Sequence, residues 1–212
     1  MTDSFVRMGV RSGWIEVITG SMFSGKSEEL IRRIRRSELA NLRFKVFKPK
    51  LDDRYSKDCV ASHNNNKISS VVIEDPLEII RHVDQYTQVV GIDEAQFMGP
   101  SIVEVARELA DCGKRVIVAG LDTDWQGRPF GPMPHLMAIA EIVDKQHAIC
   151  MVCGEPASRT QRLVANNGDI LVGSTEAYEA RCRRHFDPEL SLRLAQTQRD
   201  AQVQMTANAS QE

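Results

Sequence analysis

The chain has 212 residues, with 27 Lys plus Arg against 29 Asp plus Glu, which gives a formal net charge of −2. Hydrophobic residues make up 42% and charged residues 26%, as in ordinary soluble globular proteins. Nucleic-acid-binding proteins usually carry a basic surplus, so this balance argues against a nucleic-acid partner. No apolar run approaches the roughly 20 residues of a membrane helix, and Met1–Trp14 lacks the pattern of a secretory signal. We expect a cytoplasmic protein of one domain, with or without a small appendage.

Short apolar runs alternate with amphipathic helical patterns through the first two-thirds of the chain. Strands are predicted at Trp14–Ile18, Phe44–Phe47, Val71–Ile73, Val89–Ile92 and Val116–Ala119, and helices at Glu28–Ala40, Leu77–Val83 and Ile102–Leu109. Repeated strand and helix predict a parallel sheet with helices on both faces. In such sheets, ligands bind beyond the carboxyl ends of the strands.

Three segments fall outside this alternation. Asp52–Lys67 is polar and Asn-rich, so it is either a solvated connector or a loop that closes on substrate. Gly127–Pro134 contains three prolines and two glycines, which argues against regular structure. The Gln- and Ala-rich tail, residues 187–212, is expected to be a frayed helix or disordered.

A phosphate-binding loop follows the first predicted strand. Residues 20–27 fit the pattern G-x-x-x-x-G-K-[ST], and the strand before and the helix after them are the expected context. The two glycines allow the backbone to curl so that its N–H groups face the phosphates, and Lys26 and Ser27 are placed for the β/γ-phosphates and Mg²⁺. The predicted nucleotide-binding residues are Gly20, Ser21, Met22, Phe23, Ser24, Gly25, Lys26 and Ser27.

A second nucleotide signal is the apolar strand Val89–Ile92, which ends in two acidic residues. Asp93 is the candidate for the second Mg²⁺ contact of a phosphate-loop protein. Glu94, one residue further, is placed to take a proton from an attacking hydroxyl or water. Together the two motifs predict ATP or GTP with Mg²⁺ and leave the phosphate acceptor open.

A third signal comes from the cysteines, of which the chain has five. An odd number without a signal peptide favours metal binding or free thiols over a disulfide framework. Two short pairs, Cys150-x-x-Cys153 and Cys182-x-x-His185, stand about 28 residues apart. They predict a tetrahedral Cys₃His site for Zn²⁺, and four protein ligands leave no open position, so the zinc is structural. It would tie the base of the loop 154–181.

A dense basic cluster lies on the first predicted helix and comprises Arg32, Arg33, Arg35 and Arg36. The near-zero net charge favours a solvated helix face over a nucleic-acid patch.

Several segments together resemble the compact, zinc-containing thymidine kinases of many bacteria and of the vertebrate cytosol. They are GSMFSGKSEELIRR, the DDRYS loop, GIDEAQF, VAGLDTDWQGRPFG, and Cys-x-x-Cys followed by ASRTQRL. The resemblance runs in family order from about Gly13 to His185. It implies a P-loop (RecA-like) α/β fold with a small C-terminal zinc-binding lasso. It also implies transfer of the ATP γ-phosphate to the 5′-hydroxyl of thymidine or deoxyuridine, giving dTMP and ADP.

The resemblance also assigns roles to residues. Glu94 corresponds to the proton acceptor, and Lys26 and Arg54 to groups that contact the phosphates. The nucleoside pocket is implied to consist of Met22, Phe97, Leu121, Trp125, Phe130 and Tyr178, with the backbone of Asp169, Ile170, Leu171, Val172 and Gly173 on the thymine edge. Trp125 stands where similar sequences usually carry Phe. The larger indole still stacks on a pyrimidine but narrows the expected pocket.

The implied organisation is an ATP-binding domain at 13–145, a zinc-binding lasso at 146–186 and a polar tail at 187–212. Homotetramer assembly, inhibition by dTTP, and pyrimidine salvage follow from the same resemblance. The competing reading from the residues alone is a P-loop ATPase with a zinc ribbon, acting on nucleic acid or a protein partner. A non-catalytic zinc module would leave Lys26, Ser27, Asp93 and Glu94 without a purpose.

Overall fold

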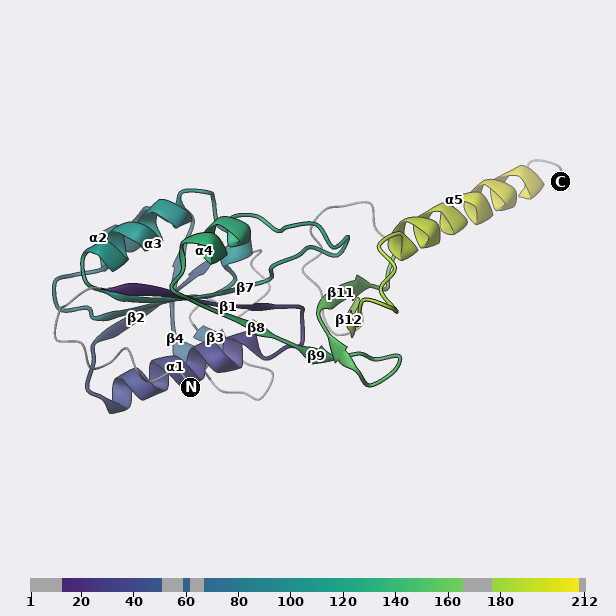
Figure 1. Ribbon diagram of the computed structural model, residues 1–212. Helices are drawn as coiled ribbons and strands as arrows, with labels where there is room; N and C mark the ends of the chain where they lie inside the picture. The colour runs from purple at the N-terminus through teal and green to yellow at the C-terminus, as the bar shows by residue number, and fades with distance from the viewer. Residues whose placement is uncertain (1–12, 51–58, 62–66, 166–176, 210–212) are drawn as a thin grey trace. The chain divides into compact units, whose positions relative to one another are not determined.

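The computed structural model describes residues 13–50, 59–61, 67–165 and 177–209 (Figure 1). The chain divides into two compact units. Unit one comprises Met1–Thr19, Gly25–Asp122 and Phe130–Lys145, and unit two comprises Gly20–Ser24, Thr123–Pro129 and Gln146–Glu212. The domain boundaries proposed from the sequence remain a prediction. No helix in the described part of the chain combines the length and apolar character that a bilayer crossing needs.

A six-stranded sheet forms the centre of unit one, in the order β5-β2-β6-β7-β1-β8. Its strands are β1 (Trp14–Gly20), β2 (Phe44–Pro49), β5 (Val71–Ile73), β6 (Val89–Ile92), β7 (Arg115–Gly120) and β8 (Ile142–Gln146). The pairs β1–β7, β7–β6, β6–β2 and β2–β5 are all parallel. The predicted parallel sheet is confirmed, and β7 separates the strand before the phosphate loop from the strand before Asp93.

Helices cover both faces of this sheet, as the alternation predicted. The helix α1 (Lys26–Leu39) lies on one face, and α2 (Glu78–His82), α3 (Ile102–Asp111) and α4 (Met133–Ile139) lie on the other (Figure 1). The strand β6 contributes apolar side chains to both faces of the sheet. Its Val90 and Ile92 pack toward α3, whereas Val89 belongs to the cluster around α1, because successive side chains of a strand point to opposite faces.

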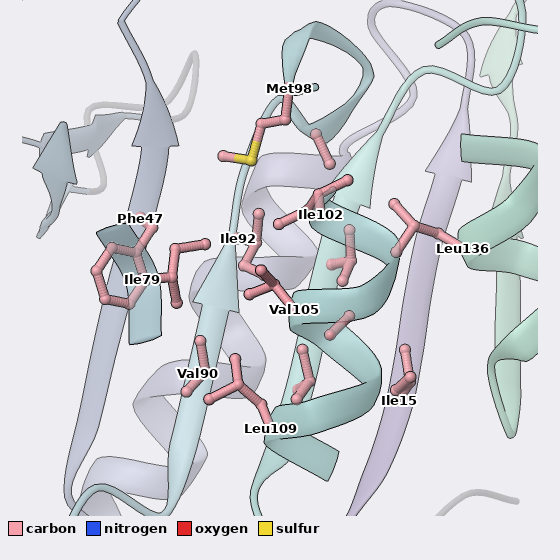
Figure 2. Packing of buried hydrophobic residues seen from close by; sticks show 14 of the residues in the cluster. Ile15, Phe47, Ile79, Val90, Ile92, Met98, Ile102, Val105, Leu109 and Leu136 are labelled. Carbon is pink, nitrogen blue, oxygen red and sulfur yellow. The ribbon is translucent and has the colours of Figure 1, made fainter. Parts of the chain in front are cut away.

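The larger hydrophobic cluster is drawn in Figure 2, where α3 lays its apolar side along the strands. Ile102, Val105 and Leu109 recur at helical spacing and are at most 4% exposed. Burying a side chain of this size contributes about 1.5–3 kcal/mol. This packing holds the carboxyl ends of β6 and β7 side by side, which positions the residues that follow them.

The basic cluster on α1 differs from the prediction of a solvated face at one residue. Arg33 is buried and donates to Glu16 at 2.6 Å, to Glu29 at 2.8 Å and to Asp144. Arg115 of β7 also donates to Glu16, at 2.6 Å. Although burial opposes it, these arginines and the Trp14 indole lower the pKa of Glu16. The residues of this ion-pair network come from three strands as well as from α1. Spacing along α1 alone therefore does not reveal the network.

Two further sequence expectations differ from the structure. The segment Gly127–Pro134 was expected to lack regular structure, but α4 begins at Met133 and includes Pro134. A proline fits there because the first turn of a helix does not use its backbone N–H groups. The short strands β3 (Cys59–Ala61) and β4 (Lys67–Ser69) pair antiparallel at the end of the polar segment expected to be a loop.

Unit two contains two small antiparallel pairs and a long helix. The strand β9 (Ala148–Ile149) pairs with β10 (Pro156–Ala157), and β11 (Arg159–Arg162) pairs with β12 (Tyr178–Arg181). The tail forms α5 (Leu190–Ala209), which agrees with the helical alternative for residues 187–212.

Candidate functional site

The phosphate loop connects β1 to α1 through residues with positive φ. Gly20 has φ 136°, Phe23 has φ 64° and Gly25 has φ 85°. A Cβ on Gly20 would lie 2.2 Å from the carbonyl oxygen of Gln146, so only glycine fits at this position. The backbone therefore curls where the motif predicts and delivers Lys26 and Ser27 into the first turn of α1.

Ser27 and Asp93 meet across unit one. The Ser27 hydroxyl lies 3.1 and 3.3 Å from the two carboxylate oxygens of Asp93. Burial and the neighbouring Glu94 carboxylate raise the pKa of Asp93 above its usual range. A buried carboxylate of this kind is stabilised in its charged form by a cation. The pair thus combines a hydroxyl and a carboxylate oxygen, which are ligands that Mg²⁺ prefers.

Lys26 completes the charged end of unit one. Burial lowers the pKa of its ammonium, while Glu94, Asp93 and Asp122 oppose that change. Asp122 follows β7, is buried, and forms an ion pair with Lys145 at 2.5 Å. Three carboxylates near one partly buried lysine would suit a ligand that brings phosphate and a divalent cation together.

Glu94 has a fixed and unusual backbone. Its φ of 54° and ψ of 36° lie in the left-handed region, and the 3-10 helix η2 (Ala95–Phe97) begins directly after it. A non-glycine residue in a sparsely populated region costs on the order of 1 kcal/mol or more, and such residues concentrate at functional sites. Its N–H donates to Asp93 Oδ1 at 3.0 Å, and its Oε2 accepts from Gln96 Nε2 at 2.5 Å.

The four predicted metal ligands converge within unit two. One ligand atom from each of Cys150, Cys153, Cys182 and His185 lies within 4.8 Å of all the others. The Cys153 and Cys182 sulfurs are 3.8 Å apart, and His185 Nδ1 is 3.4 Å from the Cys182 sulfur. A tetrahedral Zn²⁺ with bonds of about 2.3 Å would place its sulfurs about 3.8 Å apart. The arrangement fits zinc.

Electrostatics within the cluster favour a thiolate. Burial opposes the charged form of Cys150, but backbone N–H groups of Cys182, Val152 and Cys153, with His185, lower its pKa to about 5. The pKa of Cys153 is raised: a backbone hydrogen bond at Glu155 favours its thiolate, but burial and the neighbouring sulfurs outweigh it. A cation bound among them would relieve that repulsion, because metal ligands must be deprotonated.

An aromatic cluster in unit two surrounds a buried cation. Arg162 is fully buried, and its guanidinium lies 4.3 Å from the centre of the Trp125 ring. Its Nη2 and Nε donate to the Tyr178 hydroxyl at 2.9 and 3.2 Å. Met22 and Phe23 pack against the two aromatic rings.

Comparison with known proteins assigns the family. The model of the family "Thymidine kinase" matches residues 13–186. The chain belongs to the thymidine kinase family. A thymidine kinase from Bdellovibrio bacteriovorus is 60% identical over 178 residues, which cover 84% of this chain and 87% of the relative.

Two solved structures resemble the chain distantly. The genome packaging NTPase B204 from Sulfolobus turreted icosahedral virus 2, in complex with ATP-gammaS, has a TM-score of 0.43 and 20% identity over 65% of this chain and 76% of its own. The Pif1 helicase from Candida albicans has a TM-score of 0.40 and 16% identity, covering 64% and 36% respectively. Neither likeness is close enough to bear on the function of this thymidine kinase family member.

The residues predicted for the thymidine kinase pocket fall into two groups. Met22, Trp125 and Tyr178 share the cluster in unit two. In unit one, the rings of Phe97 and Phe130 meet edge to face with centres 5.3 Å apart, and Leu121 directly follows β7. Arg54 and the segment Asp169–Gly173 lie outside the described residues.

Sequence reasoning missed three buried polar residues, Asp122 and Gln96 in unit one and Arg162 in unit two. Asp122 stands at the carboxyl end of an apolar strand, which is a recognisable signal in a parallel sheet. Gln96 lies in the quoted GIDEAQF segment, but an amide gives no signal of its own. Arg162 precedes an apolar residue in a short strand, and nothing in its spacing indicates burial.

Proposed function

We propose that this member of the thymidine kinase family transfers the γ-phosphate of ATP to the 5′-hydroxyl of thymidine or deoxyuridine, giving dTMP or dUMP and ADP. Family membership supports thymidine and ATP as substrates. The observation that carries the proposal for this chain is the contact of Ser27 with Asp93 next to Glu94. This contact supports the proposal because it joins a phosphate-loop hydroxyl to a buried carboxylate, one residue before the glutamate that we propose as the proton acceptor. The zinc-ribbon ATPase alternative is not favoured.

ATP and Mg²⁺ fit the phosphate end of unit one. Ser27 and Asp93 would hold Mg²⁺, Asp93 through a coordinated water, and the cation would neutralise charge on the β- and γ-phosphates. From the sequence motif alone, we propose that backbone N–H groups of residues 20–25 receive the phosphates, and Lys26 would add a full positive charge. Burial disfavours the charged forms of both Lys26 and Asp93. A bound phosphate would offset this cost for Lys26, and a bound cation would offset it for Asp93, which supports this assignment.

The transfer step depends on positioning. The thymidine 5′-oxygen attacks the γ-phosphorus, the bond to the β–γ bridging oxygen breaks, and ADP leaves with that electron pair. Glu94 accepts the hydroxyl proton. Lys26 and Arg54 stabilise negative charge spread over the transferred group, which is the main catalytic requirement of a loose transition state.

Zinc is proposed as a structural ion bound by Cys150, Cys153, Cys182 and His185. All four positions of a tetrahedral site are protein ligands, so the ion would fix the fold of unit two and not bind substrate. The loop that it ties, residues 154–181, includes the backbone of Asp169–Gly173 proposed for the thymine edge. Trp125, Tyr178 and Met22 are proposed to contact the nucleoside, together with Phe97, Leu121 and Phe130.

Three broader properties complete the proposal. We place the enzyme in pyrimidine salvage in the cytoplasm, where free thiols and a zinc thiolate site persist. A homotetramer and feedback inhibition by dTTP are proposed from the family resemblance. An end product that carries both the thymidine moiety and a triphosphate would occupy the same groups as the two substrates.

The test is ADP formation by purified protein with Mg-ATP, comparing thymidine, deoxyuridine, deoxycytidine, deoxyguanosine and no nucleoside. We expect ADP to depend on thymidine or deoxyuridine, with the nucleoside monophosphate appearing in equal amount. ADP formed at the same rate without nucleoside would mean that water is the acceptor, and the proposal would be wrong.

A further inference from the structure

Gln96 joins the residues that end two neighbouring strands. Its side chain is almost fully buried, at 3% exposure. Its Oε1 accepts from the Leu121 N–H at 2.9 Å, directly after β7. Its Nε2 donates to Glu94 Oε2, two residues after the end of β6. We propose that Gln96 is a positioning residue that fixes the carboxylate of Glu94 for proton transfer. This inference rests on the proposed function of Glu94.

The orientation of the Gln96 amide follows from its partners. The Leu121 N–H can only donate, so the amide oxygen must face it, and the NH₂ group must then face Glu94. A carboxylate can only accept when ionised, so both contacts agree with one orientation of the amide. The donor therefore faces one carboxylate oxygen of Glu94, the proposed proton acceptor.

The surroundings hold Gln96 from both sides. A Cβ on Gly120 would lie 2.7 Å from Gln96 Oε1, and a Cβ on Gly131 would lie 2.3 Å from the Gln96 backbone oxygen. Glycine at these two positions lets the end of β7 approach the Gln96 side-chain amide and lets the segment before α4 approach the Gln96 backbone. Gln96 therefore has little freedom to move, and its Nε2 presents a fixed direction to Glu94.

The two carboxylate oxygens of Glu94 therefore have different roles in this proposal. Oε2 is occupied by the Gln96 amide, and within the described residues no hydrogen bond to Oε1 is found. Oε1 is then the oxygen left for the 5′-hydroxyl proton. A glutamate side chain otherwise has considerable rotamer freedom. One fixed oxygen reduces this freedom before substrate arrives, which is the purpose of preorganisation.

The experiment compares Gln96→Met, which keeps the side-chain length and loses both hydrogen bonds, with the wild-type enzyme and with Glu94→Gln. We expect single-turnover phosphoryl transfer to fall about 10- to 100-fold, as for loss of a hydrogen bond to a charged group. KM for thymidine and ATP should change little. Thr87→Val, which removes a buried hydroxyl at the opposite end of β6, controls for loss of stability alone.

The decisive measurement repeats the Gln96→Met change in the Glu94→Gln background. If Gln96 acts through Glu94, the change should no longer affect the rate there, although the loss of thermal stability should persist. An equal rate effect in both backgrounds would overturn the inference and leave the role of Glu94 intact. Near-normal turnover of Glu94→Gln alone would instead remove the proposed proton acceptor.

A second variant tests the proposal in case Gln96→Met folds poorly. Gln96→Glu keeps an acceptor for the Leu121 N–H and replaces the donor with a second carboxylate against Glu94. At the alkaline end of the activity range it should fold normally and lose at least as much turnover as Gln96→Met. Turnover near that of the wild type under those conditions would contradict the inference.

Discussion

The charged end of unit one and the zinc-and-aromatic part of unit two are built in different ways. In unit one, Ser27, Asp93, Glu94 and Gln96 interact through direct hydrogen bonds between groups at strand and helix ends. In unit two, four ligand atoms converge from two turns, and a fully buried Arg162 lies against Trp125. The hydrophobic core of the sheet positions the first set, whereas the four ligand atoms of the second set would be held together by the proposed zinc ion. We therefore expect substitutions in unit one to lower the rate of phosphoryl transfer, and substitutions in unit two to weaken substrate binding.

Glu94→Gln should give the largest effect on activity. The amide keeps the size of the side chain and cannot accept the hydroxyl proton, so turnover should fall about 10²- to 10⁴-fold while thymidine still binds. The measurement is turnover, with thymidine affinity determined separately by calorimetry. Glu104→Gln, an exposed residue of α3 paired with Arg107, serves as the control and should behave as the wild type.

Cys153→Ser should affect unit two and spare the sheet of unit one. Changes in the outer shell of a metal site already cost about 10- to 100-fold in metal affinity, so loss of a ligand should cost at least that. We expect a higher KM for thymidine together with substoichiometric zinc by elemental analysis. Cys112→Ser, which changes an exposed free thiol, should alter neither. Wild-type protein purified without any zinc would contradict the metal assignment.

Arg162→Met should weaken nucleoside binding without affecting the transfer step. The change removes the cation beside Trp125 and leaves the Tyr178 hydroxyl without two donors, at a cost of about 1–3 kcal/mol in unfolding free energy. We expect KM for thymidine to rise about tenfold and kcat to change little. Arg159→Met, on the same strand with a partly exposed side chain, is the control. A fall in kcat at unchanged KM would place Arg162 in the chemistry instead.

The two regions also differ in what the sequence reveals. The positions of the phosphate loop and of Asp93 were predictable because their proposed function requires a fixed spacing in the sequence beside a strand or helix. The Cys₃His set was predictable because two ligands from each turn leave a short spacing. The roles of Gln96 and Arg33 were not. Leu121 beside Gln96, and Glu16 and Asp144 beside Arg33, are far away in the sequence, and only the folded sheet brings them together. The grouping of Gly20–Ser24 with unit two, although it precedes α1 in the chain, is likewise a property that the sequence does not indicate.

The smallest predicted effect concerns Trp125. Trp125→Phe should keep an aromatic ring against Arg162 and remove an indole N–H that is buried without a hydrogen-bond partner in the described structure. Losing that donor therefore has little cost, and the weaker cation–π contact should change KM for thymidine by less than about threefold. The smaller ring should instead favour deoxyuridines with bulkier 5-substituents, by about two- to tenfold in kcat/KM relative to thymidine. The comparison uses thymidine and one such analogue, with Trp14→Phe as the control. An unchanged preference would mean that the indole does not limit the pocket, and that substrate size is selected by other residues.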